Sequence, residues 1–141
     1  GLYFEAKVAT ELGAFFSRFD PAHDGAWFAR TGDEIIGGIF IDGSDAEGRG
    51  ARLRWFIVDP MYQGRGLGNR LMAEAISFCR QKPFQRVYLT TFAGLDAARH
   101  LYEKFGFKLC HEKEGSHLTG KSSLVEQVFE LLLADGTSRL P

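Results

Sequence analysis

Apolar and polar positions in the first part of the chain predict one helix followed by three strands. Over residues 5–19 apolar side chains recur at helical spacing, which predicts an amphipathic helix that ends at Asp20-Pro21. Three segments with the composition and alternation of strands follow, at residues 26–30, 34–41 and 51–58. Their connections are short, so we expect these strands to pair antiparallel.

The third predicted strand should send its side chains alternately to the two faces of the sheet. Simple alternation puts three apolar residues on one face: Leu53, Trp55 and Ile57. It puts Arg52, Arg54 and Phe56 on the other face. The strand is expected to stop at Asp59-Pro60, because proline cannot continue a ladder.

The second part of the chain predicts helices that alternate with strands. A helix is expected over residues 67–81 and a strand over residues 86–91. A short helix over residues 96–105 precedes a strand over residues 107–112. Residues 123–133 are apolar and fit either a helix or a strand.

This order of elements predicts an α/β (α+β) fold with a mixed sheet. The strand ending at Val58 and the strand beginning at Arg86 are separated by a helix, so they should run parallel. The other strand pairs should be antiparallel, and the helices should cover the faces of the sheet. A length of 141 residues suits a single domain, and no internal repeat or linker is visible.

Composition and charge exclude several classes of function. The net charge is −1, without the basic stripe that a nucleic-acid-binding domain usually carries. The arginines Arg49, Arg52 and Arg54 can still form a local positive patch. The apolar runs are too short to span a bilayer, and no signal peptide is visible at the start. Cys79 and Cys110 lack metal-ligand spacing, which indicates a reduced cytoplasmic protein without a metal site.

A glycine-rich segment after the third strand carries the clearest chemical signal. Gly64, Gly66 and Gly68 alternate where a strand gives way to a helix. Glycine lets the backbone approach a ligand closely, and the first N–H groups of a helix are free to bind an anion. Spacing alone leaves two readings open, a diphosphate cradle or a tight turn without a ligand.

Two motifs that follow one another along the chain resemble those of the GCN5-related N-acetyltransferase (GNAT) family. Gln63-x-x-Gly66-x-Gly68 resembles the family's acetyl-CoA signature, and it follows a strand as in that family. About forty residues later, a helix with Tyr102 that ends in Gly106-Phe107 resembles the family's second motif. The resemblance covers nearly the whole chain. It implies the GNAT fold, in which the two parallel strands splay apart.

The resemblance also implies a site and a reaction. Acetyl-CoA would lie in the V between the splayed strands and donate its acetyl group to a primary amine, on a small molecule or a lysine side chain. The implied cofactor contacts are Phe56, Ile57, Val58, Gln63, Gly64, Arg65, Gly66, Leu67, Gly68 and Asn69. The sequence departs from the family at Leu95, where many members have an asparagine.

The resemblance places Tyr102 at the position of the family's general acid, which protonates the departing thiolate. A strand N–H near Ile57 or Val58 would hold the oxyanion of the intermediate. Without the family, the ordinary reading of Tyr102 is a core tyrosine on an apolar helix face. The base that accepts the amine proton stays open between water and five side chains: Glu5, Glu34, His111, Glu112 and His117.

Residues 115–122, with the sequence GSHLTGKS, match the nucleotide P-loop pattern in full. Nineteen residues follow, which is too few for the parallel strands that a P-loop fold needs. We therefore expect a loop between the last two strands and no nucleotide site. The resemblance to the GNAT family implies that this loop borders the acceptor site.

Softer matches resemble the acetyltransferase half of bacterial MarR–GNAT fusions. They include Leu53-Arg54-Trp55-Phe56 and the region from His117 to Leu131. No DNA-binding half is visible, and the first GNAT strand is expected to be absent or reduced to Leu2-Tyr3-Phe4. Two functions stay open, an active N-acetyltransferase and a non-catalytic acyl-CoA sensor. The assembly state also stays open, with a homodimer as one alternative.

Overall fold

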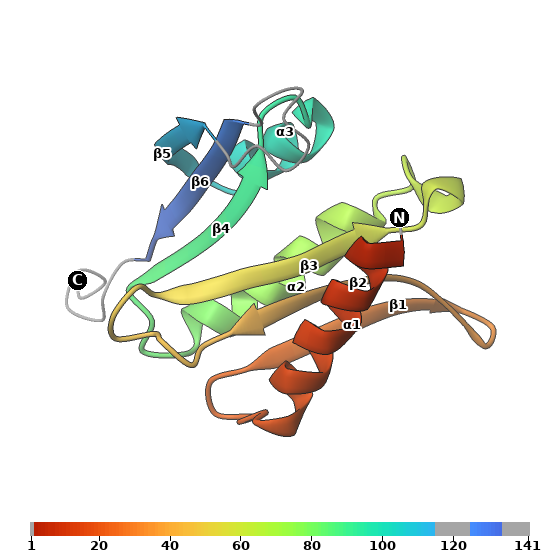
Figure 1. The fold of residues 1–141 in the computed structure, drawn as a ribbon, viewed down its shortest axis with the longest axis horizontal. Coiled ribbons are helices and arrows are strands. Elements are labelled where there is room, and N and C mark those ends of the chain that lie inside the picture. Colours follow the sequence, from red (N-terminus) through yellow and green to blue (C-terminus); the bar gives the residue numbers. More distant parts are fainter. Residues whose placement is uncertain (1, 115–124, 134–141) are drawn as a thin grey trace.

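The computed structural model describes residues 2–114 and 125–133, with side chains from Lys7 onward. Six strands form one sheet, and helices lie against both of its faces (Figure 1). In chain order the elements are α1 (Leu2–Ser17), β1 (Gly25–Thr31), β2 (Glu34–Asp42), β3 (Ala51–Val58), a 3-10 turn η1 (Pro60–Tyr62), α2 (Leu67–Arg80), β4 (Arg86–Phe92), α3 (Asp96–Lys104), β5 (Lys108–Glu114) and β6 (Val125–Leu132).

The predicted helices and strands are all present, with ends that differ by a few residues. The segment left open between helix and strand is the strand β6, which pairs with β4 on one side and β5 on the other. Leu2, Tyr3 and Phe4 lie in helix α1, so the idea that they form a reduced first strand is wrong. Cys79 and Cys110 are both free thiols.

The sheet has the order β1-β2-β3-β4-β6-β5, and its centre is the parallel pair β3 and β4. These two strands pair at their beginnings, through Ala51 with Val87 and Arg52 with Tyr88. Beyond those pairs they diverge, and the half of the sheet that contains β4, β5 and β6 turns away from β1–β3 (Figure 1). The mixed sheet with a splayed parallel pair is therefore confirmed.

The alternation predicted for β3 is wrong after Arg54, because the strand contains a β-bulge. Its register against β2 shifts between Gly38 and Phe40, and Trp55 has a positive φ of 48°. Two residues of β3 thus oppose one residue of β2. Trp55 packs on the same face as Arg54, as its contact with Phe40 indicates, and the next residues exchange faces.

The bulge gives the two faces of the sheet different partners. On one face, Phe56 and Val58 pack with Leu53 into the core that α2 and α3 cover. On the other face, α1 crosses the sheet (Figure 1), and its fully buried Phe15 ring meets Trp55 edge-on at 5.7 Å between centroids. The chain therefore has a main core of mixed aliphatic and aromatic side chains and a smaller aromatic cluster beneath α1.

Asp42, at the end of β2, forms an ion-pair network beside this aromatic cluster. Its buried carboxylate accepts hydrogen bonds from Arg18, at 2.7 Å, and from Arg54, at 3.1 Å. The hydroxyl of Ser44 also donates to it, at 2.7 Å. Burial acts to raise the pKa of Asp42, but the hydrogen bonds from Arg18 and Ser44 outweigh burial and hold it well below its usual range.

We expect Asp42→Asn to lower the free energy of unfolding by about 2–4 kcal/mol at pH 7, because two arginines lose a buried anionic partner. A carboxylate whose pKa is depressed in the folded protein stabilises the fold at pH values above its pKa in the unfolded chain, near ~3.9. This contribution is lost as the pH falls toward the pKa of the folded state. The difference between wild type and variant should therefore shrink below about pH 4. Denaturant unfolding at pH 7 and pH 3 measures both effects.

The matched control is Asp45→Asn, which removes the same charge from an exposed residue of the adjacent loop. It should change stability by less than about 0.5 kcal/mol. If the two variants were equally stable at pH 7, the network around Asp42 would contribute nothing.

Candidate functional site

The turn between β3 and α2 is shaped by two glycines in the left-handed region. Gly64 and Gly66 have φ values of 81° and 82°, and an added Cβ would meet no atom within 4 Å at either position. The side chain of Gln63 donates to the carbonyl of Val58 at 3.2 Å and holds the turn against the end of β3. Backbone conformation, and not crowding, therefore requires glycine here.

Gly66 is the N-cap of α2, and within the described part of the chain no side chain caps this helix end. The first intrahelical bond runs from the N–H of Arg70 to the carbonyl of Gly66, at 3.1 Å. The N–H groups of Leu67, Gly68 and Asn69 precede that bond and have no partner within the helix. The first turn also contains no acidic residue, so the positive end of the helix dipole is not neutralised locally.

The divergence of β3 and β4 leaves two strand edges facing each other without pairing. Within these described strands, β3 has no β4 partner after Arg52, and β4 has no β3 partner after Tyr88. Unpaired strand edges present N–H and C=O groups that an extended ligand with amide groups can bind. The V is thus lined by backbone hydrogen-bonding groups.

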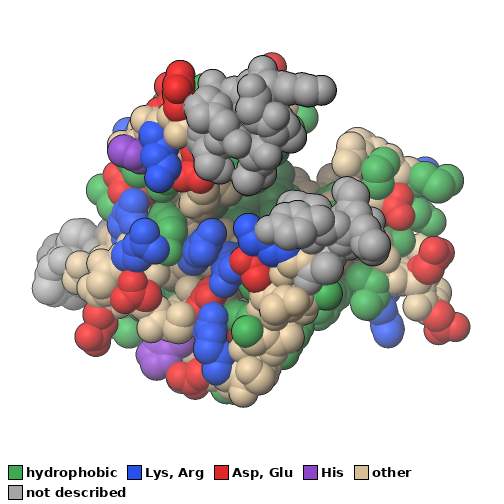
Figure 2. All heavy atoms as spheres, in the orientation of Figure 1, with side chains coloured by type: hydrophobic (Ala, Val, Ile, Leu, Met, Phe, Trp, Pro, Cys, Tyr) green, Lys and Arg blue, Asp and Glu red, His purple; other side chains and the backbone are tan. Residues whose placement is uncertain are grey.

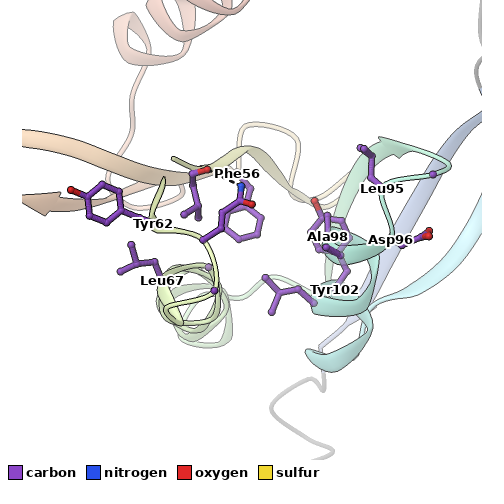
Figure 3. Close-up of a pocket in the computed structure, with 14 residues that line it drawn as sticks. Phe56, Tyr62, Leu67, Leu95, Asp96, Ala98 and Tyr102 are labelled. Carbon is purple, nitrogen blue, oxygen red and sulfur yellow. Dashed lines mark hydrogen bonds between the residues drawn. The ribbon is translucent and has the colours of Figure 1, made fainter. Parts of the chain in front are cut away.

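A cavity of about 690 Å³ occupies the α2 and α3 side of this V. Phe56, Tyr62 and Leu67 lie on one wall, and Leu95, Asp96 and Tyr102 lie on the other (Figure 3). The volume is in the range of a pocket for a small-molecule ligand.

Most of the residues predicted to contact the cofactor line this cavity: Phe56, Val58, Gln63, Gly64, Leu67, Gly68 and, as the predicted acid, Tyr102. Four predicted residues do not line it: Ile57, Arg65, Gly66 and Asn69. The Ile57 side chain is exposed on the opposite face of β3, which follows from the bulge. The contact predicted for Ile57 involves its backbone, so the direction of its side chain does not test that prediction.

The side chains around the glycine turn add positive charge beside the helix end. Arg65 is exposed, and its guanidinium lies 5.1 Å from the centre of the Tyr62 ring. Lys104, at the end of α3, donates to the side-chain oxygen of Asn69 at 2.9 Å and so connects α3 to the start of α2. An anion at the turn would have both cations nearby.

Tyr102 is 7% exposed and packs among Phe56, Phe107 and Phe129. Burial raises the pKa of its hydroxyl above the ordinary value, so the group keeps its proton at neutral pH. Tyr102 packs in the core and also borders the cavity. A packing role and a chemical role for this side chain are therefore compatible.

A second cavity of about 460 Å³ lies on the α1 side of the V. Residues of α1, β3, β4 and β6 line it, including Lys7, Glu11, Arg52, Arg54 and Glu126. Four residues border both cavities: Phe56, Leu95, Ala98 and Tyr102. The two cavities therefore meet at Tyr102, where molecules that enter from opposite faces of the sheet could come into contact.

The carboxylates of the second cavity were not among the predicted bases. Glu11 comes from α1 and Glu126 from β6. Glu34, His111 and Glu112, which were predicted candidates, line neither cavity. Nothing in the local sequence marks Glu11 or Glu126, because each reaches the cavity through the packing of elements distant in the chain.

Two predicted features lie outside the part of the chain whose side chains are described. These are the candidate base Glu5 and the region 115–122, with its P-loop pattern and His117. In the described part, no three His, Cys, Asp or Glu side chains gather as a metal ion would require. None of the described helices has the length and apolar character needed to cross a membrane.

Comparison with known proteins identifies the family. The model of the acetyltransferase (GNAT) family matches residues 3–107. The chain therefore belongs to the GNAT family of acetyltransferases, as the two sequence motifs had indicated. The region 115–122 lies beyond the matched residues.

Relatives and solved structures agree with this assignment. The chain is 34% identical over 99 residues to the N-alpha-acetyltransferase RimI of Mycobacterium tuberculosis, an overlap of 67% of this chain and 59% of that protein. It resembles a GNAT-family acetyltransferase from Streptococcus pneumoniae (TM-score 0.70, 25% identity, 79% of this chain and 68% of the other). It also resembles a Bacillus anthracis protein assigned as a streptothricin acetyltransferase and solved with acetyl coenzyme A (TM-score 0.68, 25% identity, 79% and 63%).

The curated relatives are longer proteins than the region that matches. The chain spans between 38% and 59% of their length.

The uncapped N-terminus of α2 should bind the diphosphate of coenzyme A, and substitution of Gly66 tests this. We expect Gly66→Asp to weaken binding of coenzyme A by about 10–100-fold relative to Gly66→Asn, since a carboxylate would stand beside the diphosphate. Both side chains tolerate the left-handed region and are nearly the same size, so the pair differs in charge alone. Calorimetry with coenzyme A measures the difference, and thermal unfolding checks that both variants fold. Equal affinities would place the diphosphate elsewhere.

Proposed function

We propose that the chain is an acetyl-CoA-dependent N-acetyltransferase that transfers an acetyl group to a primary amine by direct attack. The observation that carries the proposal is the meeting of two cavities at Tyr102, one beside the glycine turn and one on the opposite face. Family membership supports acetyl transfer, and the name of the relative RimI supports an amine as acceptor.

In this proposal the donor occupies the cavity between α2 and α3. The diphosphate of acetyl-CoA lies on the N–H groups of residues 63–69, with Arg65 adding charge. The pantetheine arm follows the unpaired edge of β3 at Phe56, Ile57 and Val58, through its amide groups. Support comes from the open left-handed turn, the uncapped helix and a similar protein solved with acetyl coenzyme A.

The acceptor enters from the α1 side. Its neutral amine attacks the thioester carbonyl, a C–N bond forms, and the C–S bond breaks to release the thiolate of coenzyme A. A backbone N–H of β3 near Ile57 or Val58 stabilises the oxyanion, because the bulge and the divergence from β4 leave ladder groups unpaired in this region. The amine proton leaves through water or one of the cavity carboxylates, Glu11 or Glu126.

Tyr102 gives its proton to the departing thiolate. Its position at the junction of the cavities suits this role, and its raised pKa keeps the proton available at neutral pH. A thiol has an ordinary pKa near ~8.5, below that of a tyrosine, so transfer from Tyr102 is uphill even to the full thiolate and is completed as the amine proton returns to the tyrosine through water. The tyrosine then stabilises the charge mainly by hydrogen bonding as the bond breaks.

We take residues 1–141 as one acetyltransferase domain and expect it to act in the cytoplasm without a metal ion. The narrower resemblance to MarR–GNAT fusions and the homodimer stay predictions. A non-catalytic acyl-CoA sensor would bind coenzyme A equally well. Release of free thiol from acetyl-CoA with an amine panel separates a sensor from an enzyme.

Tyr102→Phe removes one hydroxyl and retains the ring that packs against Phe56 and Phe129. We expect the rate of the chemical step to fall by ~10²–10⁴-fold, as for loss of a general acid. Affinity for coenzyme A should change by less than about 3-fold, because the hydroxyl contributes little to ground-state binding. Single-turnover kinetics with acetyl-CoA and the preferred amine measure the step without interference from product release.

The matched control is Tyr88→Phe. Tyr88 is also a buried tyrosine, but it lines neither of the two cavities. Its variant should retain the wild-type single-turnover rate. Full activity in Tyr102→Phe would leave that side chain with a packing role.

A further inference from the structure

The described residues that line the cavity on the α1 side carry more positive than negative charge. Among the described residues that line it, three are cations and two are anions: Lys7, Arg52, Arg54, Glu11 and Glu126. Figure 2 shows Lys and Arg side chains gathered on this face, beside α1. An amine acceptor is itself a cation in solution, so this excess is the opposite of what a simple amine would need.

Both anions already have partners in the protein. Glu11 lies 3.6 Å from Arg54, and Arg54 is also held by Asp42 and stacks over Trp55 at 4.0 Å. Glu126 lies 3.8 Å from Lys113 on β5. The carboxylates of the cavity are thus balanced by neighbouring cations.

Arg52 differs from Arg54 in having no such partner among the described residues. Its side chain is partly buried, yet no hydrogen bond or ion pair joins it to another described residue. A guanidinium has five N–H donors and binds a carboxylate through two parallel hydrogen bonds. A carboxylate in the cavity would meet these donors without a competing protein partner among the described residues.

The position of Arg52 suits a ligand that also reaches the reacting centre. Arg52 belongs to the last paired residues of β3 and β4, at the vertex of the V, and Phe56 lies four residues further along the same strand. Four strand residues span roughly 13 Å, and Arg52 and Phe56 line the same cavity. The hydroxyl-bearing Thr90 and Thr91 of β4 line the cavity between these two points.

We propose that the acceptor is a small amine that also carries a carboxylate, such as an amino acid, and that Arg52 binds this carboxylate. The inference rests on the proposed acetyl transfer in the same cleft and adds the substrate class. Lys7, at the exposed edge of the same cavity, contributes to the attraction of the anion without a described partner of its own.

The test compares amino acids with the amines that lack their carboxylate: phenylalanine with phenethylamine, lysine with cadaverine, and alanine with ethylamine. We expect wild-type kcat/KM to favour the amino acid of a pair. In Arg52→Gln, kcat/KM for amino acids should fall by about 10–100-fold, while the values for the decarboxylated amines change by less than about 3-fold. Comparing each substrate between two proteins cancels differences in amine basicity.

Two further variants separate a binding role from a structural one. Arg52→Lys keeps the charge without the paired geometry and should recover part of the preference for amino acids. Arg30→Gln removes the same charge from an exposed residue of β1 outside both cavities, and it should leave all substrates unchanged. An equal loss for both members of each pair in Arg52→Gln would overturn the inference, as would a wild-type preference for the decarboxylated amines.

A binding experiment keeps this inference distinct from the proposed reaction. Calorimetry with N-acetylphenylalanine and N-acetylphenethylamine, each added to the protein with coenzyme A, requires no turnover. We expect the first to bind at least about 10-fold more tightly, and this advantage should vanish in Arg52→Gln. If no amine is acetylated but this difference is present, the reaction fails and the carboxylate site stands. Equal binding of the two probes overturns the carboxylate site.

Discussion

The incomplete pairing of β3 with β4 is the constraint on which the site depends. A parallel pair at the centre of a sheet normally continues along both strands, because each unpaired N–H or C=O loses a hydrogen bond. Here the pairing stops after Arg52 and Tyr88, and beyond these residues the edges by which the two described strands face each other are unpaired. The two cavities occupy the space between these edges, one on each face of the sheet.

Interactions on either side of the V hold the strands apart. β4 pairs with β6 along its whole length, from Arg86 with Leu132 to Phe92 with Glu126, so its direction is set away from β3. β3 is turned by its bulge, where Trp55 adopts a positive φ that a tryptophan rarely takes. The contacts of Trp55 with Phe15, Phe40 and Arg54 compensate for that conformation. Helix α1 thus stabilises the open V as well as forming one wall of it.

Much of the fold could be predicted from the sequence, because the patterns that define it are local. Helical and strand periodicity located the helices α1, α2 and α3 and the strands β1–β5, and the connections gave the parallel pair. The bulge at Trp55 could not be predicted, since residues 51–58 alternate acceptably in either register and the choice is made by packing against Phe15 and Phe40. For the same reason the strand character of residues 125–132 became clear through pairing with both β4 and β5.

The donor and acceptor sides of the candidate site also differ in how far they could be predicted from the sequence. The glycine turn of the donor side is one continuous segment, where Gly64 and Gly66 are required by their φ values, so its motif is readable in a single sequence. The acceptor side is assembled from α1, β3, β4 and β6, and Glu11 and Glu126 are 115 residues apart in the chain. A donor site that uses mainly backbone groups tolerates side-chain changes, whereas an acceptor site that uses side chains from several elements can change its charge by one substitution. Differences in acceptor among proteins of this fold are therefore expected to reside at positions such as Lys7 and Arg52, which no sequence motif marks.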